Sequence, residues 1–576
     1  MQIETLAKPR VIVLTDITNE PDDEQSMVRF LCYTNEFDVE GLVATTSCWL
    51  RDKVVSERIQ ERVEAYGLVR NNLLKHASGY PETEYLLNVI KSGLPVYGME
   101  GVGKGQSSMG SNLIIEVVDK PDPCPVWVCV WGGVNCLAQA LWEVKHNRSR
   151  EEIDAFVSKL RIYTISDQDN TAPWIRRTFP NLFYIVSPGY EENGGGAYHY
   201  ATWVGISGDK FHGRFDGADF SMVDNPWLDQ HIRQNHGPLG ELHPQTKYLL
   251  EGDTPTFLYL IPNGLGVPEK PNYGNWEGRY EFYIPNQQKW HYEQEARPIW
   301  TDAVDEVIGI DGKTYKTNQA TIWRWRQASQ HDFAARIDWT VAENYQDANH
   351  NPVAAFSHDT SKGVVTLEVK SGEVVTLSAA GTFDPDGHNI LYYWFLYKDF
   401  EFVDGITITA WIRPTLKAGP GTWQLIAAKG RDVHEFFEIL LHPTGFIWMG
   451  WKLTGGRAVP DKSPLDVKKN VWQHIAVSYQ SGKWWTTYLN GEVLIDYPKK
   501  NDKLIPLDAP LFLGAEEPLG MNRYYNGDTD DFAIFNRGLS QDEIKQVQAG
   551  MGKIMAIQPQ AKLHTAWVRL KTKYLQ

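Results

Sequence analysis

The chain has 576 residues, of which 42% are hydrophobic and 22% are charged, and its formal net charge is −16 at pH 7. A single hydrophobic core does not grow beyond about 250–300 residues, so we expect several domains. The hydrophobic share excludes a disordered protein, and the negative charge argues against nucleic acid or an anionic membrane surface as a partner.

The start of the chain, MQIETLAKPR, lacks the apolar stretch of a signal peptide. No run of about 18 apolar residues occurs either, so we expect no membrane span. The cysteines form no CxxC pair, which argues against a structural zinc site and favours buried free thiols. All five lie in the first quarter of the chain: Cys32, Cys48, Cys124, Cys129 and Cys136.

From residue 10 to about residue 345, short apolar runs alternate with longer amphipathic stretches. Examples are VIVLTD (11–16) followed by EQSMVRFLCYTNEF (24–37), and VWVCVWGG (126–133) followed by VNCLAQALWEV (134–144). Strand and helix in alternation predict a mostly parallel sheet with helices on both faces. We therefore predict an α/β domain over residues 8–345.

Three carboxylates follow the first of these strands. The strand ends in Asp16, and a turn leads to Asp22 and Asp23 at the start of the next helix. Ligands of open α/β sheets bind beyond the carboxyl ends of the strands. Helix capping explains one or two of these residues, but hardly all three. Carboxylates this close repel one another unless neutralised, and Ca²⁺ prefers several such oxygens, so we predict a metal site.

A second polar group follows the later strand LRIYTIS (160–166), and it is placed to hydrogen-bond sugar hydroxyls, although an Asx-rich turn explains it equally well. We interpret the tryptophan after it as a sugar platform and the arginine as an anion contact. A histidine beyond a glycine-rich loop could contact substrate, with a structural role as the alternative. The predicted substrate-binding residues are Asp167, Gln168, Asp169, Asn170, Trp174, Arg176 and His199.

Near Asn351 the pattern changes to the alternation of antiparallel β-structure. Residues 346–400 are typical of an Ig-like segment, but they hold only three or four strands, fewer than the seven or so that a complete sandwich needs. Many short strands follow over residues 401–550, which indicates a sandwich or jelly roll. Residues 551–576 form a basic tail without clear periodicity.

The N-terminal motifs resemble a known family. TDITNEPDDEQSMVRFL, WGGVNCLAQAL, YTISDQDNTAPWIRRTFP and GDTPTFLYLIPNGLG are similar to the inosine-uridine nucleoside hydrolase superfamily, and most closely to its cellulose-binding proteins with a nucleoside-hydrolase-like domain. The resemblance implies a Ca²⁺ site in which Asp16 binds metal and acts as the general base. It also implies Asp22 and Asp23 as the ligand pair, Asp253 as the distant fourth acidic ligand, and Asn135 at a position whose carbonyl binds calcium.

The sequence departs from the nucleoside hydrolases in several places. Five residues separate Asp16 from Asp22, two more than in those enzymes. Gly252 stands where some of them have a leaving-group histidine. The loop asparagine expected after the second strand is missing at 46–48, and GGVNCLA replaces the usual GPLTNLA. These departures put recognition of a nucleoside base in question.

The C-terminal strands resemble a second family. WQHIAVSY (472–479), NGEVL (490–494) and GDTDDFAIFNRGLSQDEI (527–544) are similar to laminin G-like or concanavalin A-like sandwiches, which bind glycans or serve as spacers. We therefore predict a multidomain protein: an α/β nucleoside-hydrolase-like domain, an all-β Ig-like segment and a laminin G-like jelly-roll sandwich.

The leading prediction for function is a metal-dependent hydrolase of N- or O-glycosyl bonds, with appended modules that bind polysaccharide. Its substrate would be a carbohydrate or a nucleoside-like molecule, and the family resemblance implies a secreted or periplasmic location. One alternative is a non-catalytic protein that binds cellulose or another polysaccharide and keeps the hydrolase-like fold. A weaker alternative is an adhesive surface protein in which the laminin-like module does the binding.

Overall fold

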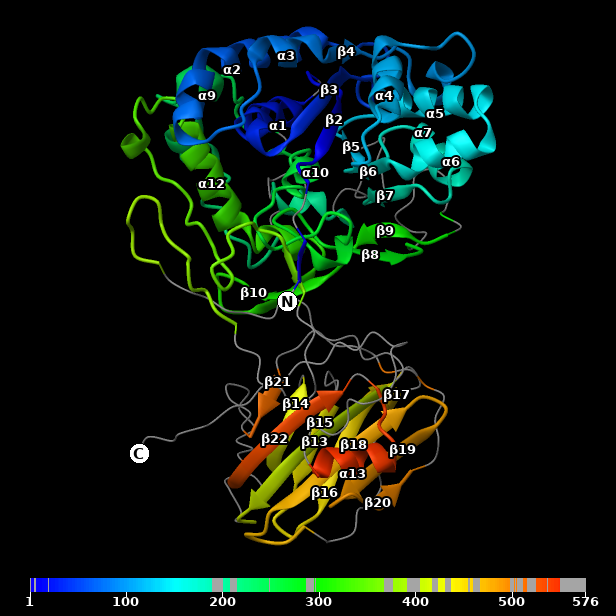
Figure 1. Ribbon diagram of the computed structural model, residues 1–576, viewed down its shortest axis with the longest axis vertical. Coiled ribbons are helices and arrows are strands. Elements are labelled where there is room, and N and C mark those ends of the chain that lie inside the picture. The colour runs from blue at the N-terminus through cyan, green and yellow to red at the C-terminus, as the bar shows by residue number, and fades with distance from the viewer. Residues whose placement is uncertain are drawn as a thin grey trace. The chain divides into compact units, whose positions relative to one another are not determined.

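The computed structural model describes most of residues 2–549, and Figure 1 labels its helices and strands. The parts of the chain outside this description are residues 1, 5–6, 19, 189–199, 208–214, 248, 286–294, 296, 367–376, 391–404, 417–422, 430–436, 454–455, 459–466, 498–501, 503, 505–510, 515–524, 536 and 550–576. The chain forms two compact units. The first comprises Met1–Thr366 and Leu377–Tyr392, and the second comprises Leu367–Thr376 and Tyr393–Gln576.

The first unit is built on an eight-stranded sheet with the order β4-β3-β2-β5-β6-β7-β9-β8. Every neighbouring pair is parallel except β8 and β9, which are antiparallel. The mostly parallel sheet predicted from the sequence is thus confirmed. The strands are β2 (Arg10–Thr15), β3 (Asp38–Ala44), β4 (Ile90–Ser92), β5 (Val126–Val130), β6 (Leu160–Thr164), β7 (Phe183–Val186), β8 (Tyr280–Tyr283) and β9 (Ile299–Asp302).

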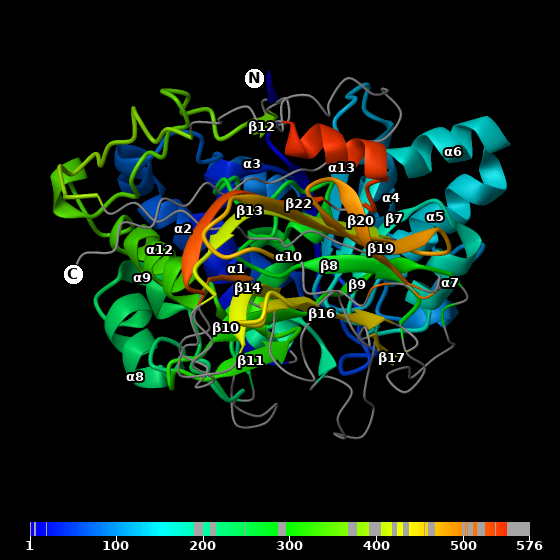
Figure 2. The same cartoon turned by 90° about the horizontal axis from the view of Figure 1, so that it is seen from below.

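Helices cover both faces of this sheet because the central strands are apolar on both sides. In β2, Val11 and Val13 belong to one hydrophobic core, whereas Ile12 and Leu14 belong to the other. The first core receives α1 (Pro21–Cys32), α2 (Ser56–His76), α9 (Gly237–Glu241), α10 (Pro255–Leu258) and α12 (Arg326–Asp338). The second receives α4 (Met109–Asp119), α5 (Asn135–Asn147), α6 (Arg150–Ser158) and α7 (Thr171–Thr178). Figure 2 shows the two groups of helices on opposite sides.

Smaller elements complete the first unit. They are β1 (Gln2–Glu4), which pairs with β12 (Val364–Thr366), the hairpin of β10 (Asp305–Ile308) and β11 (Thr314–Thr317), and the short helices α3 (Thr83–Asn88), α8 (Asn225–Leu228) and α11 (Ala320–Trp323).

The second unit is a sandwich of two five-stranded antiparallel sheets, as expected for a jelly roll. One sheet contains β13 (Gly405–Pro414), β18 (Gln473–Gln480), β19 (Trp484–Leu489), β20 (Glu492–Asp496) and β22 (Gly527–Phe535). The other contains β14 (Gln424–Lys429), β15 (Phe437–Leu441), β16 (Ile447–Leu453), β17 (Gly456–Ala458) and β21 (Leu511–Leu513).

The core of the sandwich lies between its two sheets. Ile406 and Ile408 of β13 meet Phe437 and Ile439 of β15 in one hydrophobic cluster. The helix α13 (Gln541–Gln548) packs on the outer side of the first sheet through a smaller cluster. This helix lies over the sheet in Figure 1.

The predicted Ig-like segment differs from a free-standing domain in the described residues. Between residues 346 and 390, the structure describes one three-residue strand, β12, and two isolated bridges, Val353 with Phe383 and Phe356 with Asp359. Most of these residues cluster with the α/β unit rather than forming a unit of their own. An Ig-like sandwich is therefore not seen in the described part of this segment, and its exact limits stay a prediction.

All five cysteines are free thiols, and four of them are buried, whereas Cys124 is partly exposed. Burial raises the pKa of the Cys129 thiol to about 12 and that of the Cys136 thiol to about 11. Within the described residues, no helix combines the length and apolar character needed to cross a bilayer.

Candidate metal-binding and active site

The predicted carboxylates come from three places at one edge of the α/β sheet. Asp16 follows the last residue of β2, a central strand. Asp22 and Asp23 lie in the first turn of α1, where the helix dipole stabilises negative charge. Asp253 lies just before α10, more than two hundred residues further along the chain. The fold thus brings residues distant in sequence to the carboxyl end of the parallel strands, where ligands bind.

Three of the carboxylates form a compact group. Asp22, Asp23 and Asp253 each offer one oxygen, and these oxygens all lie within 4.8 Å of one another. All three side chains are buried, and Asp253 is only 1% exposed. Asp23 accepts a hydrogen bond from the hydroxyl of Thr15, whereas Oδ2 of Asp253 has no hydrogen-bond partner among the described residues. A buried oxygen without a partner is costly, and a bound cation would satisfy it.

The electrostatics of these carboxylates also favour a bound cation. Burial raises the pKa of Asp16 to about 6, while a hydrogen bond from Ser47 opposes this rise. Burial also raises the pKa values of Asp22, Asp23 and Asp253, and the charges of the neighbouring carboxylates raise them further. Asp16 contributes to each of these three shifts, so it lies beside the compact group and interacts with it. A hard divalent cation would relieve this mutual repulsion.

Glycines make room for the carboxylates. A Cβ atom on Gly132 would stand 2.4 Å from Oδ1 of Asp16, and one on Gly133 would stand 2.6 Å from Oδ2 of Asp169. A Cβ atom on Gly252 would stand 2.9 Å from Oδ2 of Asp22. Such distances are shorter than real Cβ contacts, so a larger residue at these positions would push the carboxylates away.

Two of the predicted substrate-binding residues bind each other. Arg176 donates two hydrogen bonds to Asp167, from Nη1 to Oδ1 at 2.8 Å and from Nη2 to Oδ2 at 2.7 Å. Its Nε donates to Glu295 at 2.6 Å, and its guanidinium group lies over the ring of Tyr184. Arg176 has no exposed side-chain surface. Both groups therefore act within the fold, and a substrate role for them stays a prediction without support from their contacts.

The remaining residues of this polar group have mixed surroundings. Gln168 donates from Nε2 to the carbonyl of Trp131 at 2.6 Å, and Asn170 accepts from the amide of Met99 at 2.9 Å. Asp169 accepts from the backbone amide of Thr171 through Oδ1, but its buried Oδ2 has no hydrogen-bond partner among the described residues. Burial raises the pKa of Asp169 to about 6. Of the group, Asp169 alone keeps an unused buried oxygen.

Three further predicted residues have less direct links to the cluster. The side-chain amide of Asn135 accepts from Thr45 at 2.5 Å and donates to Thr46 and to the carbonyl of Val96, whereas the predicted calcium ligand at this position is the backbone carbonyl. The ring of Trp174 packs edge-on against Phe179 beside the second core. His199 lies outside the described residues. Their predicted roles stay untested.

One residue beside the site was not predicted from the sequence. Trp203 is 3% exposed, and its Nε1 donates to Oγ of Ser166, just beyond β6, at 2.9 Å. Its Cζ3 would lie 2.9 Å from a Cβ atom on Gly252, so the indole occupies part of the space that a side chain at position 252 would need. The chain has 22 tryptophans, and nothing in the sequence around Trp203 separates it from those of the cores.

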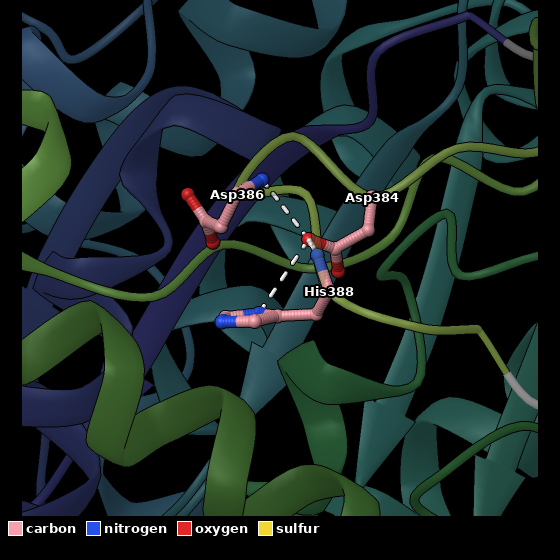
Figure 3. Close-up of side chains that lie close together, drawn as sticks. All are labelled: Asp384, Asp386 and His388. Carbon is pink, nitrogen blue, oxygen red and sulfur yellow. Dashed lines mark hydrogen bonds and ion pairs between the residues drawn. The ribbon is translucent and has the colours of Figure 1, made fainter.

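A second group of possible metal ligands lies in the turn at residues 384–388, and Figure 3 shows it. Oδ1 of Asp384 accepts from the backbone amides of Asp386 at 2.9 Å and His388 at 3.1 Å. Nδ1 of His388 lies 3.5 Å from the same oxygen, and Asp386 pairs with His350 at 2.9 Å. These contacts account for the turn by its own hydrogen bonding, and we assign it no ligand.

The first unit is thus an α/β domain with a mostly parallel sheet covered on both faces and an acidic cluster at its carboxyl edge, and the second is an antiparallel β-sandwich. Both units match known families. Residues 10–280 match the family described as the cellulose-binding Sde182, nucleoside hydrolase-like domain. Residues 396–545 match the Laminin_G_3 family of the concanavalin A-like lectin/glucanases superfamily. The chain thus joins a domain of each kind.

A solved structure of a nucleoside hydrolase-related hypothetical protein from Saccharophagus degradans, described as associated with carbohydrate metabolism, is similar over most of its length. It is 29% identical, with a TM-score of 0.55, over 79% of this chain and 98% of that chain. A putative carbohydrate-binding protein from Bacteroides ovatus is 16% identical, with a TM-score of 0.21, over 25% of this chain and 41% of its own.

The carbohydrate-binding module CBM40 of a sialidase from Ruminococcus gnavus, solved with sialyllactose, is 18% identical, with a TM-score of 0.22, over 25% of this chain and 83% of its own. No protein with a curated description matches this chain.

Proposed function

We propose that the first unit is a calcium-dependent hydrolase of glycosidic bonds and that the sandwich binds polysaccharide near the substrate. The observation that carries this proposal is the group of three buried carboxylate oxygens, all within 4.8 Å of one another, from Asp22, Asp23 and Asp253. Retaining so many buried, mutually repelling acids is costly for the fold, which favours a site that uses them. The all-oxygen donor set suits Ca²⁺ better than softer metals.

The residues of the chain have separate parts in the proposed reaction. Asp22, Asp23 and Asp253 would hold Ca²⁺, which when bound would orient a water molecule and sugar hydroxyls. Asp16 would accept the proton of the attacking water. Because burial raises its pKa only to about 6, Asp16 is mostly deprotonated at neutral pH and suited to act as a general base. The water would attack the anomeric carbon while the glycosidic bond breaks.

The departing group would leave without help from the residue before Asp253. Gly252 has no side chain, and Trp203 fills the adjoining space. A leaving group that needs protonation must therefore receive its proton elsewhere. This arrangement favours a sugar substrate over a purine nucleoside, and it also favours the second candidate function, binding without cleavage. The matching family is described as cellulose-binding, which supports that second candidate.

The two candidates are separated by product release. Wild-type protein and the Asp16→Asn variant would be incubated, with Ca²⁺, with cello-oligosaccharides, other glycans and nucleosides, and free sugar or base would be measured. If the protein is an enzyme, the wild type should release free sugar or base and the Asp16→Asn variant should not, while both proteins still bind Ca²⁺ or glycan. Asp154→Asn, a change at an exposed residue of α6, serves as the control. Glycan binding with no release from any substrate would instead establish the binding protein.

A further inference from the structure

The helix α1 carries polar side chains well beyond its acidic first turn. Gln25, Ser26 and Arg29 have no exposed surface, although most of their neighbours on this helix are apolar. Arg29 lies seven residues after Asp22, which is about two turns of an α-helix, so the two side chains point from similar sides of it. A buried polar stripe must find its partners within the fold.

These partners lie in the short segment that carries Asp253. Oε1 of Gln25 accepts from the backbone amide of Glu251 at 2.9 Å. Oγ of Ser26 accepts from the hydroxyl of Thr254 at 2.9 Å, and Nη1 of Arg29 donates to Oε2 of Glu251 at 2.6 Å. The helix α1, which supplies Asp22 and Asp23, therefore contacts the segment that carries Asp253 on both sides of that residue.

The ion pair of Arg29 and Glu251 is the centre of these contacts. Both side chains are fully buried. Arg29 also donates to Oε1 of Gln330 at 2.8 Å and to the carbonyl of Ser329 at 2.6 Å, which fixes it against α12. Oε1 of Glu251 lies 3.1 Å from Nε2 of His243. The guanidinium and the carboxylate are thus each held by further partners.

The backbone at Glu251 shows that its position is imposed by these contacts. Its φ angle is +49°, in the left-handed region that residues other than glycine rarely adopt. Such a conformation is strained and persists where surrounding contacts determine it. Two residues later, Asp253 points toward Asp22 and Asp23, whose charges repel it. The segment is therefore held in place against a force that would move it outward.

We infer that Arg29 and Glu251 are positioning residues, which hold Asp253 at the distance from Asp22 and Asp23 that a cation requires. Stability alone does not demand this pair, because a buried ion pair can often be replaced by apolar residues of similar size without loss. A role in placing Asp253 accounts for it. The inference rests on the proposed function, since it takes the three carboxylates to be metal ligands.

The test separates the placing of Asp253 from general stability. The Arg29→Met and Glu251→Leu substitutions would be combined in the full chain, so that neither charge is left alone. After removal of metal by a chelator, the melting temperature and the dissociation constant for Ca²⁺ would be measured for wild type and variant. We expect a variant that still folds, with a lower melting temperature because Ser329, Gln330 and His243 each lose a partner, and with Ca²⁺ binding that is at least about tenfold weaker.

A matched control uses another buried pair far from the cluster. Arg10 and Glu40 pair at 2.9 Å, and Arg10 is at the opposite end of β2 from Asp16. Arg10→Met combined with Glu40→Leu should leave Ca²⁺ affinity unchanged. Should the first double variant not fold, Arg29→Lys keeps the charge but shortens the reach of the side chain, and it should weaken Ca²⁺ binding several-fold.

The possible outcomes are distinct. A folded Arg29→Met/Glu251→Leu protein, or Arg29→Lys protein, with wild-type Ca²⁺ affinity would overturn the positioning role and leave the proposed metal site intact. Equal weakening by the Arg10 and Glu40 control would also overturn it, because the effect would then be a general one. Wild-type protein that binds no Ca²⁺ would refute the proposed metal site itself, and the positioning role with it.

Discussion

Asp16→Asn should make the calcium-free protein more stable at neutral pH, although it removes the proposed general base. Burial raises the pKa of Asp16 from 3.8 to about 6. Above pH 6 the folded protein holds a buried charge that the unfolded chain carries in water. The ionised Asp16 therefore destabilises the folded state. At 1.36 kcal/mol per pKa unit, this penalty amounts to about 3 kcal/mol at most, and to about 1 kcal/mol if water enters the calcium-free cluster. The amide has no charge, but its oxygen can still accept the hydrogen bond from Ser47.

The prediction can be tested because the stabilising effect of Asp16→Asn should depend on pH. Because the folded pKa is the higher one, the penalty is fully present above pH 6 and disappears as pH falls toward 3.8. Urea denaturation in the presence of a chelator would compare wild type, Asp16→Asn and the exposed-site control Asp154→Asn at pH 7.5 and pH 4.5. The denaturation midpoint of Asp16→Asn should exceed that of the wild type by a large amount at pH 7.5 and by a much smaller amount at pH 4.5. A variant less stable than wild type at pH 7.5, or an equal gain at both values, would refute the reasoning.

Three further predictions concern the same unit. Gly252→Ala places a Cβ atom 2.9 Å from both Asp22 and Trp203, so it should cost about 1–3 kcal/mol in denaturation experiments and weaken Ca²⁺ binding in calorimetry. Ca²⁺ affinity should fall at least about tenfold between pH 7.5 and pH 5.5, because protons compete for carboxylates whose pKa values are raised; a flat titration series would contradict this. Arg176→Met leaves the Asp167 carboxylate uncompensated, so it should lower the free energy of unfolding by about 3–5 kcal/mol while Ca²⁺ affinity stays the same.

The fold was largely predictable from the sequence because its signals are local. The apolar strand at 11–16 and the helical stretch after it have the periodicities of their structures, and Asp16, Asp22 and Asp23 lie at the junction between them. Asp253 could be assigned only through the resemblance, because no local pattern in the sequence shows that its segment lies near the end of the first strand. The structure supplies that contact.

The contacts of polar side chains were less predictable. Asp167 and Arg176 have the composition of a sugar-binding loop, yet they form a buried ion pair, and spacing alone does not distinguish the two outcomes. Trp203 and Glu251 gave no local signal, because their importance comes from segments far away in sequence. The sequence shows that Gln25, Ser26 and Arg29 are polar residues of one helix, but it does not show that they are buried or which segment they contact.

The free thiols determine how the native protein responds to oxidants and alkylating reagents. A thiol reacts as its thiolate, and burial raises the pKa of the Cys129 and Cys136 thiols far above physiological pH. These buried thiols should therefore stay reduced in an oxidising or a reducing compartment alike. Cys124 alone is partly exposed. A maleimide dye should attach there first, which offers a single attachment point for fluorescence measurements without any engineered cysteine.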